Sequence, residues 1–187
     1  MMIPRRLALM LPWATAAGTL ALGVLPRKLH AERLPALTEG LSPVSPPQDL
    51  PDGVFVAQDG SSHRLPEFKG RGMVVNMWAT WCAPCVAEMP SLEVLAKALA
   101  PHDIAVLPLS SDRGGADVVS AWYKAHGISG LPVLLDPKGA MARAFNANGI
   151  PTTVIINAAG QVVARLEGAA DWGAPEAEIL IRKLTAV

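Results

Sequence analysis

Two cysteines mark the part of the sequence that could do chemistry. Cys82 and Cys85 lie in the stretch NMWATWCAPCVAEMP, residues 76–90, and are the only cysteines among the 187 residues. Such a pair can form a structural disulfide, supply two ligands of a metal site, or cycle between dithiol and disulfide in a redox reaction. The surrounding sequence separates these three possibilities.

The metal and structural interpretations explain little. A zinc site needs four ligands. Besides the two sulfurs, the chain offers only histidines without metal-site spacing, His30, His63, His102 and His126. A structural disulfide that closes so short a loop restricts the unfolded chain little, and it does not explain why the pair lies where a strand leads into a helix. The sequence therefore favours a redox centre and no metal.

The elements around the pair support this interpretation. Residues 73–80, MVVNMWAT, form an unbroken apolar run that predicts a central strand covered on both faces. Residues 82–100 place apolar side chains at helical spacing and predict a helix. Cys82 would lie in the first turn of this helix, where free N–H groups and the helix dipole favour a thiolate. Cys82 is thus the expected attacking sulfur, and Cys85, one turn deeper, the resolving thiol.

The remaining elements predict an α/β fold with a mixed sheet. Residues 54–65 read as a hairpin that turns at Asp59 and Gly60, and residues 152–168 as a second hairpin. Between them, expected strands alternate with expected helices, as is typical of parallel strands with helical connections. These segments are 104–112 and 132–136 for the strands, and 116–127 and 140–149 for the helices. Residues 175–187 predict a closing helix with Pro175 in its first turn.

The first 53 residues have a different composition. Residues 7–26 carry no charge and follow Arg5 and Arg6, so residues 1–34 are expected to be an export segment, long enough to cross a bilayer. We favour a retained inner-membrane anchor and a periplasmic domain; the alternative is a cleaved signal and a soluble periplasmic protein. Residues 35–53 contain five prolines and predict an extended, semi-rigid spacer before a folded domain at 54–187.

The charge distribution argues against nucleic acid as a partner. Five of the 16 basic residues and one of the 16 acidic residues precede Leu37. The rest of the chain therefore carries 11 basic and 15 acidic residues, a net charge of minus four. Such a domain offers no basic patch that would neutralise phosphates.

Two motifs together resemble a known family. WATWCAPCVAEMP, residues 78–90, followed by GIPTT, residues 149–153, is similar to the TlpA-like and ResA-like exported disulfide reductases of the thioredoxin superfamily. The resemblance extends from Val54 to the C-terminus. It includes the opening hairpin and, at residues 115–136, a helix and a strand similar to an insertion of that family. It implies a thioredoxin fold and thiol:disulfide oxidoreductase activity without a bound cofactor.

The resemblance also implies roles for individual residues. Cys82 is the nucleophile, Cys85 the resolving thiol, and Pro151 a cis-proline that faces the disulfide. A strand end without an N–H beside the sulfurs would leave the backbone of Ile150 free to pair with an extended substrate. Trp81 is expected to form part of the surface that contacts the substrate.

Glu88 has two open interpretations. It follows Cys85 by three residues and shares its helix face, so the family suggests that its carboxylate accepts the proton of Cys85. The alternative is a surface acid on a helix. Asn76 occupies the position of a buried aspartate in cytosolic thioredoxins, which would leave Glu88 as the only nearby acid. Trp78 and Trp172 are interpreted as packing residues.

The two residues between the sulfurs indicate the direction of electron flow. Ala83 brings no cation or donor, and Pro84 has no N–H. Cys82 therefore lacks the additional stabilisation of its thiolate that makes a strong oxidant. We expect a reductant that a thiol donor in the membrane keeps reduced, because the exported compartment is oxidising.

The expected clients are apocytochrome c, during cytochrome c maturation, or a copper protein whose ligand thiols must be free. The sequence does not choose between them. Two other functions stay open. One is a metallochaperone that holds Cu(I) on the two sulfurs, since soft thiolates suit that ion. The other is an oxidase that introduces disulfides.

Overall fold

Strand β4 (Gly72–Trp78) lies inside a mixed sheet, and all seven of its residues are buried. The computed structural model describes residues 36–186. Within them, one sheet of eight strands has the order β1-β8-β7-β4-β5-β6-β2-β3. The apolar run predicted as a covered central strand is thus confirmed.

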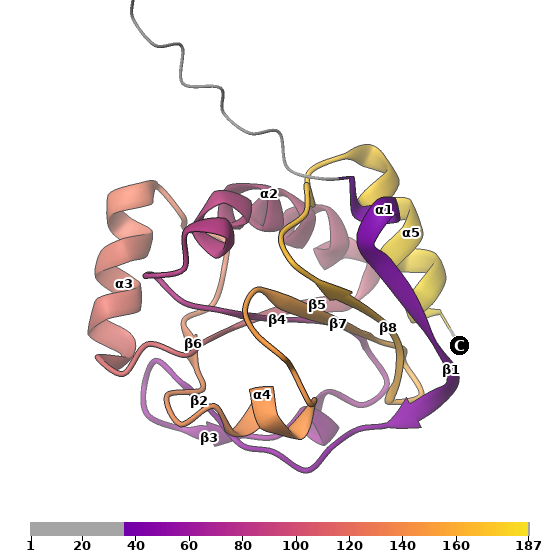
Figure 1. The fold of residues 1–187 in the computed structure, drawn as a ribbon, viewed down its shortest axis with the longest axis horizontal. Helices are drawn as coiled ribbons and strands as arrows, with labels where there is room; N and C mark the ends of the chain where they lie inside the picture. The colour runs from indigo at the N-terminus through magenta and orange to yellow at the C-terminus, as the bar shows by residue number, and fades with distance from the viewer. Residues whose placement is uncertain (1–35, 187) are drawn as a thin grey trace, which may run out of the picture. The chain divides into compact units, whose positions relative to one another are not determined.

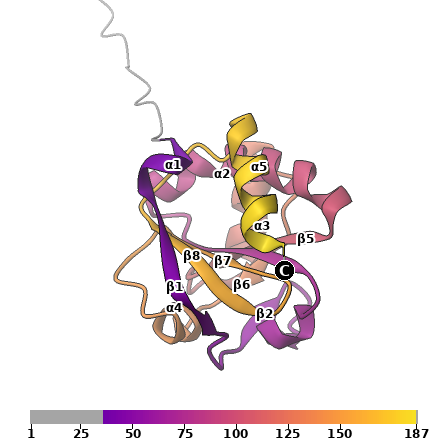
Figure 2. The ribbon, with the colours of Figure 1, turned by 90° about the vertical axis from the view of Figure 1, so that its right-hand side faces the viewer.

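Alternate residues of β4 face two hydrophobic cores. Val74 and Trp78 pack in a core with helices α2 (Ala83–Leu99), α3 (Gly115–His126) and α5 (Pro175–Thr185). Met73, Val75 and Met77 face the other core, with α4 (Ala140–Ala144) and the 3-10 turn η1 (Leu65–Phe68). Figures 1 and 2 show α2 and α5 on one side of the sheet and α4 on the other. Helices therefore cover both faces.

Strand directions bring three loops to one end of the sheet. β4 runs parallel to β5 (Ile104–Ser110), so the loops that follow these two strands are neighbours. β7 (Thr152–Ile156) is antiparallel to β4, with Thr152 opposite Met77. The residue before β7, Pro151, therefore lies near the end of β4, where the chain continues to the cysteines. A short 3-10 turn, η2 (Ala100–His102), connects α2 to β5.

The fold is a thioredoxin fold with the two additions that the sequence predicted. The opening hairpin consists of β2 (Phe55–Ala57) and β3 (Ser62–His63), and it joins the sheet through β6 (Leu134–Leu135). α3 and β6 form the helix–strand insertion. Only two residues of the expected strand 132–136 form β6.

The expected spacer at residues 35–53 is wrong for most of its length. After a short helix α1 (Leu37–Gly40), strand β1 (Leu41–Asp49) pairs antiparallel with β8 (Gln161–Glu167). The segment is extended, as its prolines indicated, but it belongs to the sheet. Prolines are tolerated because β1 is an edge strand, whose outer N–H groups need no partner. The folded part thus begins before residue 41.

The expected export segment and its role as an anchor or a cleaved signal concern residues that the structure does not describe. The export segment at residues 1–34, with its uncharged run 7–26, lies outside residues 36–186. Among the residues that are described, no helix is both long and apolar enough to span a bilayer.

Candidate active site

The two cysteines lie where β4 leads into α2. Cys82 is the N-cap residue of α2, and its sulfur accepts a hydrogen bond from the backbone N–H of Cys85 at 3.4 Å. The two sulfurs form a disulfide with an S–S distance of 2.09 Å. Cys82 is 7% exposed, whereas Cys85 is fully buried. The pair is therefore able to react from one side only, at Cys82.

The loop that delivers Cys82 is held by an aspartate that the sequence did not single out. Asp112 is buried just after β5 and accepts hydrogen bonds from the backbone N–H of Thr80 at 2.9 Å and from its hydroxyl at 2.7 Å. Ser110 donates its hydroxyl to the same carboxylate at 2.7 Å. Trp81 follows this anchored residue and is 70% exposed. The arrangement holds a large aromatic surface beside the disulfide.

The segment before β7 reaches the disulfide from the other side. The Ile150–Pro151 peptide bond is cis, as the resemblance implied. The carbonyl oxygen of Ile150 lies 3.7 Å from the sulfur of Cys82, a contact without a hydrogen bond because a disulfide sulfur has no proton to donate. Thr152 donates its hydroxyl to the Gly149 carbonyl at 2.7 Å and fixes this turn. The backbone of Ile150 therefore borders Cys82.

Glu88 is fully buried, so its interpretation as a surface acid is wrong. One carboxylate oxygen accepts the side-chain N–H of Asn76 at 2.9 Å. The other accepts the indole N–H of Trp172 at 2.8 Å and the backbone N–H of Ala170 at 3.0 Å. Three neutral donors thus surround a carboxylate one helical turn after Cys85.

The pKa of the Glu88 carboxyl is raised, because burial removes water from the charged form. The hydrogen bonds from Trp172, Asn76 and Ala170 act in the opposite direction, because they favour the ionised form. A carboxyl with a raised pKa holds a proton more readily than an exposed one. A buried carboxyl of this kind is a candidate acceptor for a proton from Cys85.

Asn76 and Trp172 belong to this site, although sequence reasoning gave Trp172 only a packing role. Asn76 also donates to the Thr153 hydroxyl at 2.9 Å, so it links β4, β7 and α2. Its Oδ1 atom has no hydrogen-bond partner among the described residues. Trp78 is fully buried in the core, in keeping with its expected packing role. Glu88 and Trp172 lie far apart in the sequence, so no local pattern indicates that their side chains are in contact.

The two residues between the cysteines add no polar side chain to the site. Ala83 and Pro84 occupy the first two positions of α2, and both are exposed.

Within residues 36–186, no group of three or more His, Cys, Asp or Glu side chains has an arrangement that could hold a metal ion.

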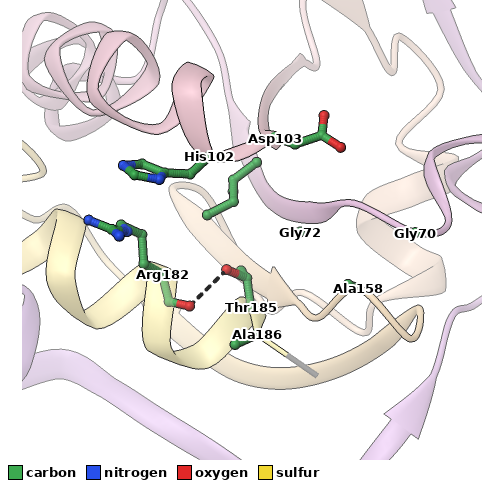
Figure 3. A pocket seen from close by; sticks show the side chains of 9 residues that line it. Gly70, Gly72, His102, Asp103, Ala158, Arg182, Thr185 and Ala186 are labelled. Atoms are coloured by element: carbon green, nitrogen blue, oxygen red, sulfur yellow. Dashed lines mark hydrogen bonds between the residues drawn. The ribbon is translucent and has the colours of Figure 1, made fainter.

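A cavity of about 320 Å³ lies away from the cysteines. Its lining includes Gly72, the first residue of β4, and Thr185, near the end of α5, whereas Cys82 follows the opposite end of β4. Figure 3 shows the side chains of His102 and Arg182 at this cavity. Both lie within ion-pair distance of Glu178, at 3.5 and 3.2 Å. The cavity is therefore separate from the candidate active site.

Cys82 is expected to alkylate first in the reduced protein. At a helix N-terminus, free N–H groups and the helix dipole favour the thiolate, which is the form that reacts with iodoacetamide. Cys85 is buried and has no such access. Peptide mapping after brief treatment with iodoacetamide at neutral pH measures the order. Faster labelling of Cys85 would reverse the roles of the two cysteines.

Comparisons with known proteins agree with this site. Residues 46–181 match the Redoxin family. The chain is 30% identical over 112 residues to the thiol-disulfide oxidoreductase ResA of Geobacillus kaustophilus, a match that covers 60% of this chain and 63% of that protein. The match to ResA of Bacillus subtilis is 29% over 133 residues and covers 71% and 73%. The chain thus spans less than two thirds of the first of these relatives.

Solved structures show the same architecture. StoA from Bacillus subtilis is 25% identical with a TM-score of 0.55, over 71% of this chain and 96% of that chain. The exposed lipoprotein thioredoxin Etrx1 of Streptococcus pneumoniae is 28% identical with a TM-score of 0.58, over 70% and 96%. With the family match over residues 46–181, these similarities show that the chain belongs to the Redoxin family, as a ResA-like and TlpA-like member of the thioredoxin superfamily.

Proposed function

We propose that this chain is a thiol:disulfide oxidoreductase that reduces disulfides in exported proteins through Cys82 and Cys85. The observation that carries the proposal is the position of the disulfide, which caps α2 with its outer sulfur 3.7 Å from the Ile150 carbonyl oxygen. Further support comes from the relatives named thiol-disulfide oxidoreductase ResA. The site joins a reactive sulfur to a backbone segment on which an extended client can lie.

In the proposed reaction the reduced pair gives two electrons to the client. The thiolate of Cys82 attacks one sulfur of the client disulfide, and the other client sulfur leaves as a thiolate. Cys85 then attacks Cys82, the bond from Cys82 to the client breaks, and the second client sulfur leaves. Glu88 receives the proton that Cys85 loses. The backbone of Ile150 and the exposed ring of Trp81 hold the client beside Cys82.

The proposed location is the periplasm, with residues 7–26 as an inner-membrane anchor or, alternatively, as a cleaved signal. The name of the relative Etrx1, an exposed lipoprotein thioredoxin, supports an extracytoplasmic site. The proposed clients are apocytochrome c or copper-site proteins, and the proposed electron donor is a thiol protein of the membrane. In an oxidising compartment a reductant needs such a donor for each turnover.

The reduction potential is expected to lie near the ~−270 mV of thioredoxin and well below the ~−120 mV of DsbA. The reason is that Ala83 and Pro84 offer no side-chain donor to the Cys82 thiolate. Equilibration of the purified protein with glutathione or dithiothreitol measures the potential, and reduction of insulin measures the activity. A DsbA-like potential would identify an oxidase. Tight Cu(I) uptake without disulfide reduction would identify a metallochaperone.

A further inference from the structure

The loop between β8 and α5, residues 168–174, is attached to Glu88 through Trp172. The indole N–H of Trp172 donates to one oxygen of the Glu88 carboxylate at 2.8 Å, and the backbone N–H of Ala170 donates to the same oxygen at 3.0 Å. Trp172 is fully buried in the core that α2 shares with the sheet. One side chain of this loop thus reaches the proton acceptor of the proposed reaction.

A second set of contacts fixes the same loop to the backbone of α2. The backbone N–H of Trp172 donates to the Ser91 hydroxyl at 3.2 Å, and Ser91 donates to the Glu88 carbonyl at 2.8 Å. The tryptophan is therefore held at both its main chain and its ring, which leaves the indole N–H with one orientation. Asn76 holds the other carboxylate oxygen from β4.

We propose that Trp172 is a positioning residue, whose indole N–H holds the Glu88 carboxylate in the orientation and in the ionised form that accept the proton of Cys85. This inference rests on the proposed function. A packing role alone would need the ring but not its N–H. The two roles are separable because phenylalanine keeps an aromatic ring and lacks the donor.

The surroundings of Glu88 make this one donor important. The groups that bond to its carboxylate are neutral, namely the Trp172 indole, the Asn76 amide and the Ala170 backbone. Burial raises the pKa of Glu88, and the Trp172 hydrogen bond is the largest influence that lowers it. Loss of that bond is expected to raise the pKa of Glu88 further, which favours the protonated carboxyl that accepts no proton from Cys85.

Other titratable groups lie near this carboxyl. Cys85 precedes it by one turn of α2 and Cys82 caps the same helix, while Asp171 lies in the loop and accepts the Gly173 backbone N–H at 3.0 Å. The two cysteines titrate only in the reduced protein. When Cys82 is joined to a client, Cys85 is the one free thiol of the chain. A pH titration of this form therefore reports on Glu88 and Cys85 together.

The step under test is the release of a client thiol. Cys85 gives its proton to Glu88, and its sulfur forms a bond to the Cys82 sulfur. The bond between Cys82 and the client sulfur breaks, and the client leaves as a thiolate that takes a proton from water. The rate falls as pH falls through the pKa of Glu88, because the protonated acid accepts no proton. A higher pKa moves this decline to higher pH.

The experiment compares Trp172→Phe with the original protein. Cys82 is loaded with a test peptide, and single-turnover release is followed against pH. A carbon NMR titration of labelled glutamate, with Glu88→Gln to assign the signal, gives the Glu88 pKa without any reaction. We expect both midpoints to move upward by about one pH unit, the size of one hydrogen bond to a charged group. Trp122→Phe is the matched control, since Trp122 stacks on His126 and should move neither midpoint.

The other possible results count against either the inference or the proposed function. Unchanged midpoints in a folded Trp172→Phe protein would overturn the inference. It would also be overturned if Trp172→Phe shifted the release profile by the same amount in a protein that already carries Glu88→Gln. If Trp172→Phe does not fold, Ser91→Ala, which frees the Trp172 backbone, must shift both midpoints in the same direction for the inference to stand. Failure of the original protein to reduce any disulfide would instead overturn the proposed function, while the NMR titration still reports the bond.

Discussion

Cys85→Ser is expected to stop turnover and to leave Cys82 joined to its client through a disulfide. Cys82 can still attack a client, because it caps α2 and keeps access to solvent at 7% exposure. The mixed disulfide cannot resolve, because no second thiol remains in the chain. Insulin reduction should fall to the uncatalysed rate, and non-reducing electrophoresis with mass spectrometry should reveal the trapped clients.

Cys82→Ser is the matched control for this experiment. It also stops turnover, but it should trap no client, because Cys85 is fully buried. Clients recovered on Cys85 in this variant would contradict the assignment of the attacking sulfur. The identity of proteins trapped by Cys85→Ser in the exported compartment also decides between apocytochrome c and copper-site proteins as clients.

Glu88→Gln is expected to slow release of the mixed disulfide by about 10²-fold, the low end of general acid–base contributions. Glutamine has the shape of glutamate but accepts no proton at neutral pH. The fold should survive the change. The glutamine oxygen can accept the Trp172 and Ala170 donors. Its NH₂ then faces the Asn76 amide, which must turn over to present Oδ1, an atom without a partner among the described residues.

The pH dependence provides the test of the Glu88 prediction. With glutamate, release should decline as pH falls through a raised carboxyl pKa; with glutamine, this decline should vanish and the rate should be low throughout. Glu93→Gln is the control on the same helix, because Glu93 accepts the Ser129 backbone N–H and touches none of the site residues described above. Equal turnover of Glu88→Gln and the original protein from about pH 6 to about pH 9 would remove Glu88 from the reaction.

Most of the fold follows from periodic patterns, and the exception has a physical reason. The buried strand β4 and the amphipathic helix α2 are continuous, so their apolar spacing identified them directly. At strand β1 the sequence predicts a spacer, because Pro43, Pro46 and Pro47 interrupt any such spacing. An edge strand can carry prolines, and its membership of the sheet depends on β8, more than a hundred residues later.

Some residues of the candidate site can likewise be predicted from the sequence, and others cannot. Cys82 and Cys85 lie within one short motif. The cis conformation of the Ile150–Pro151 bond is implied by the resemblance of the chain to a family. The burial of Glu88 depends on Trp172, which lies 84 residues away along the chain. Tryptophan is a common core residue, and nothing in its local sequence indicates that its N–H bonds a carboxylate. Contacts between distant polar groups inside the core carry no periodic signal.

The prolines of β1 also restrict where a client protein can attach. A sheet edge normally invites an extended chain to add as a further strand, through its unpaired N–H and C=O groups. β1 is the long edge of this sheet, and Pro43, Pro46 and Pro47 offer no N–H to a visiting chain. The opposite edge, β3, has only two residues. Both sheet edges are therefore poor docking sites for a proposed client, and the backbone of Ile150 beside Cys82 remains the proposed pairing surface. Because both edges bind an extended chain poorly, encounters in which a client's disulfide meets Cys82 would be favoured.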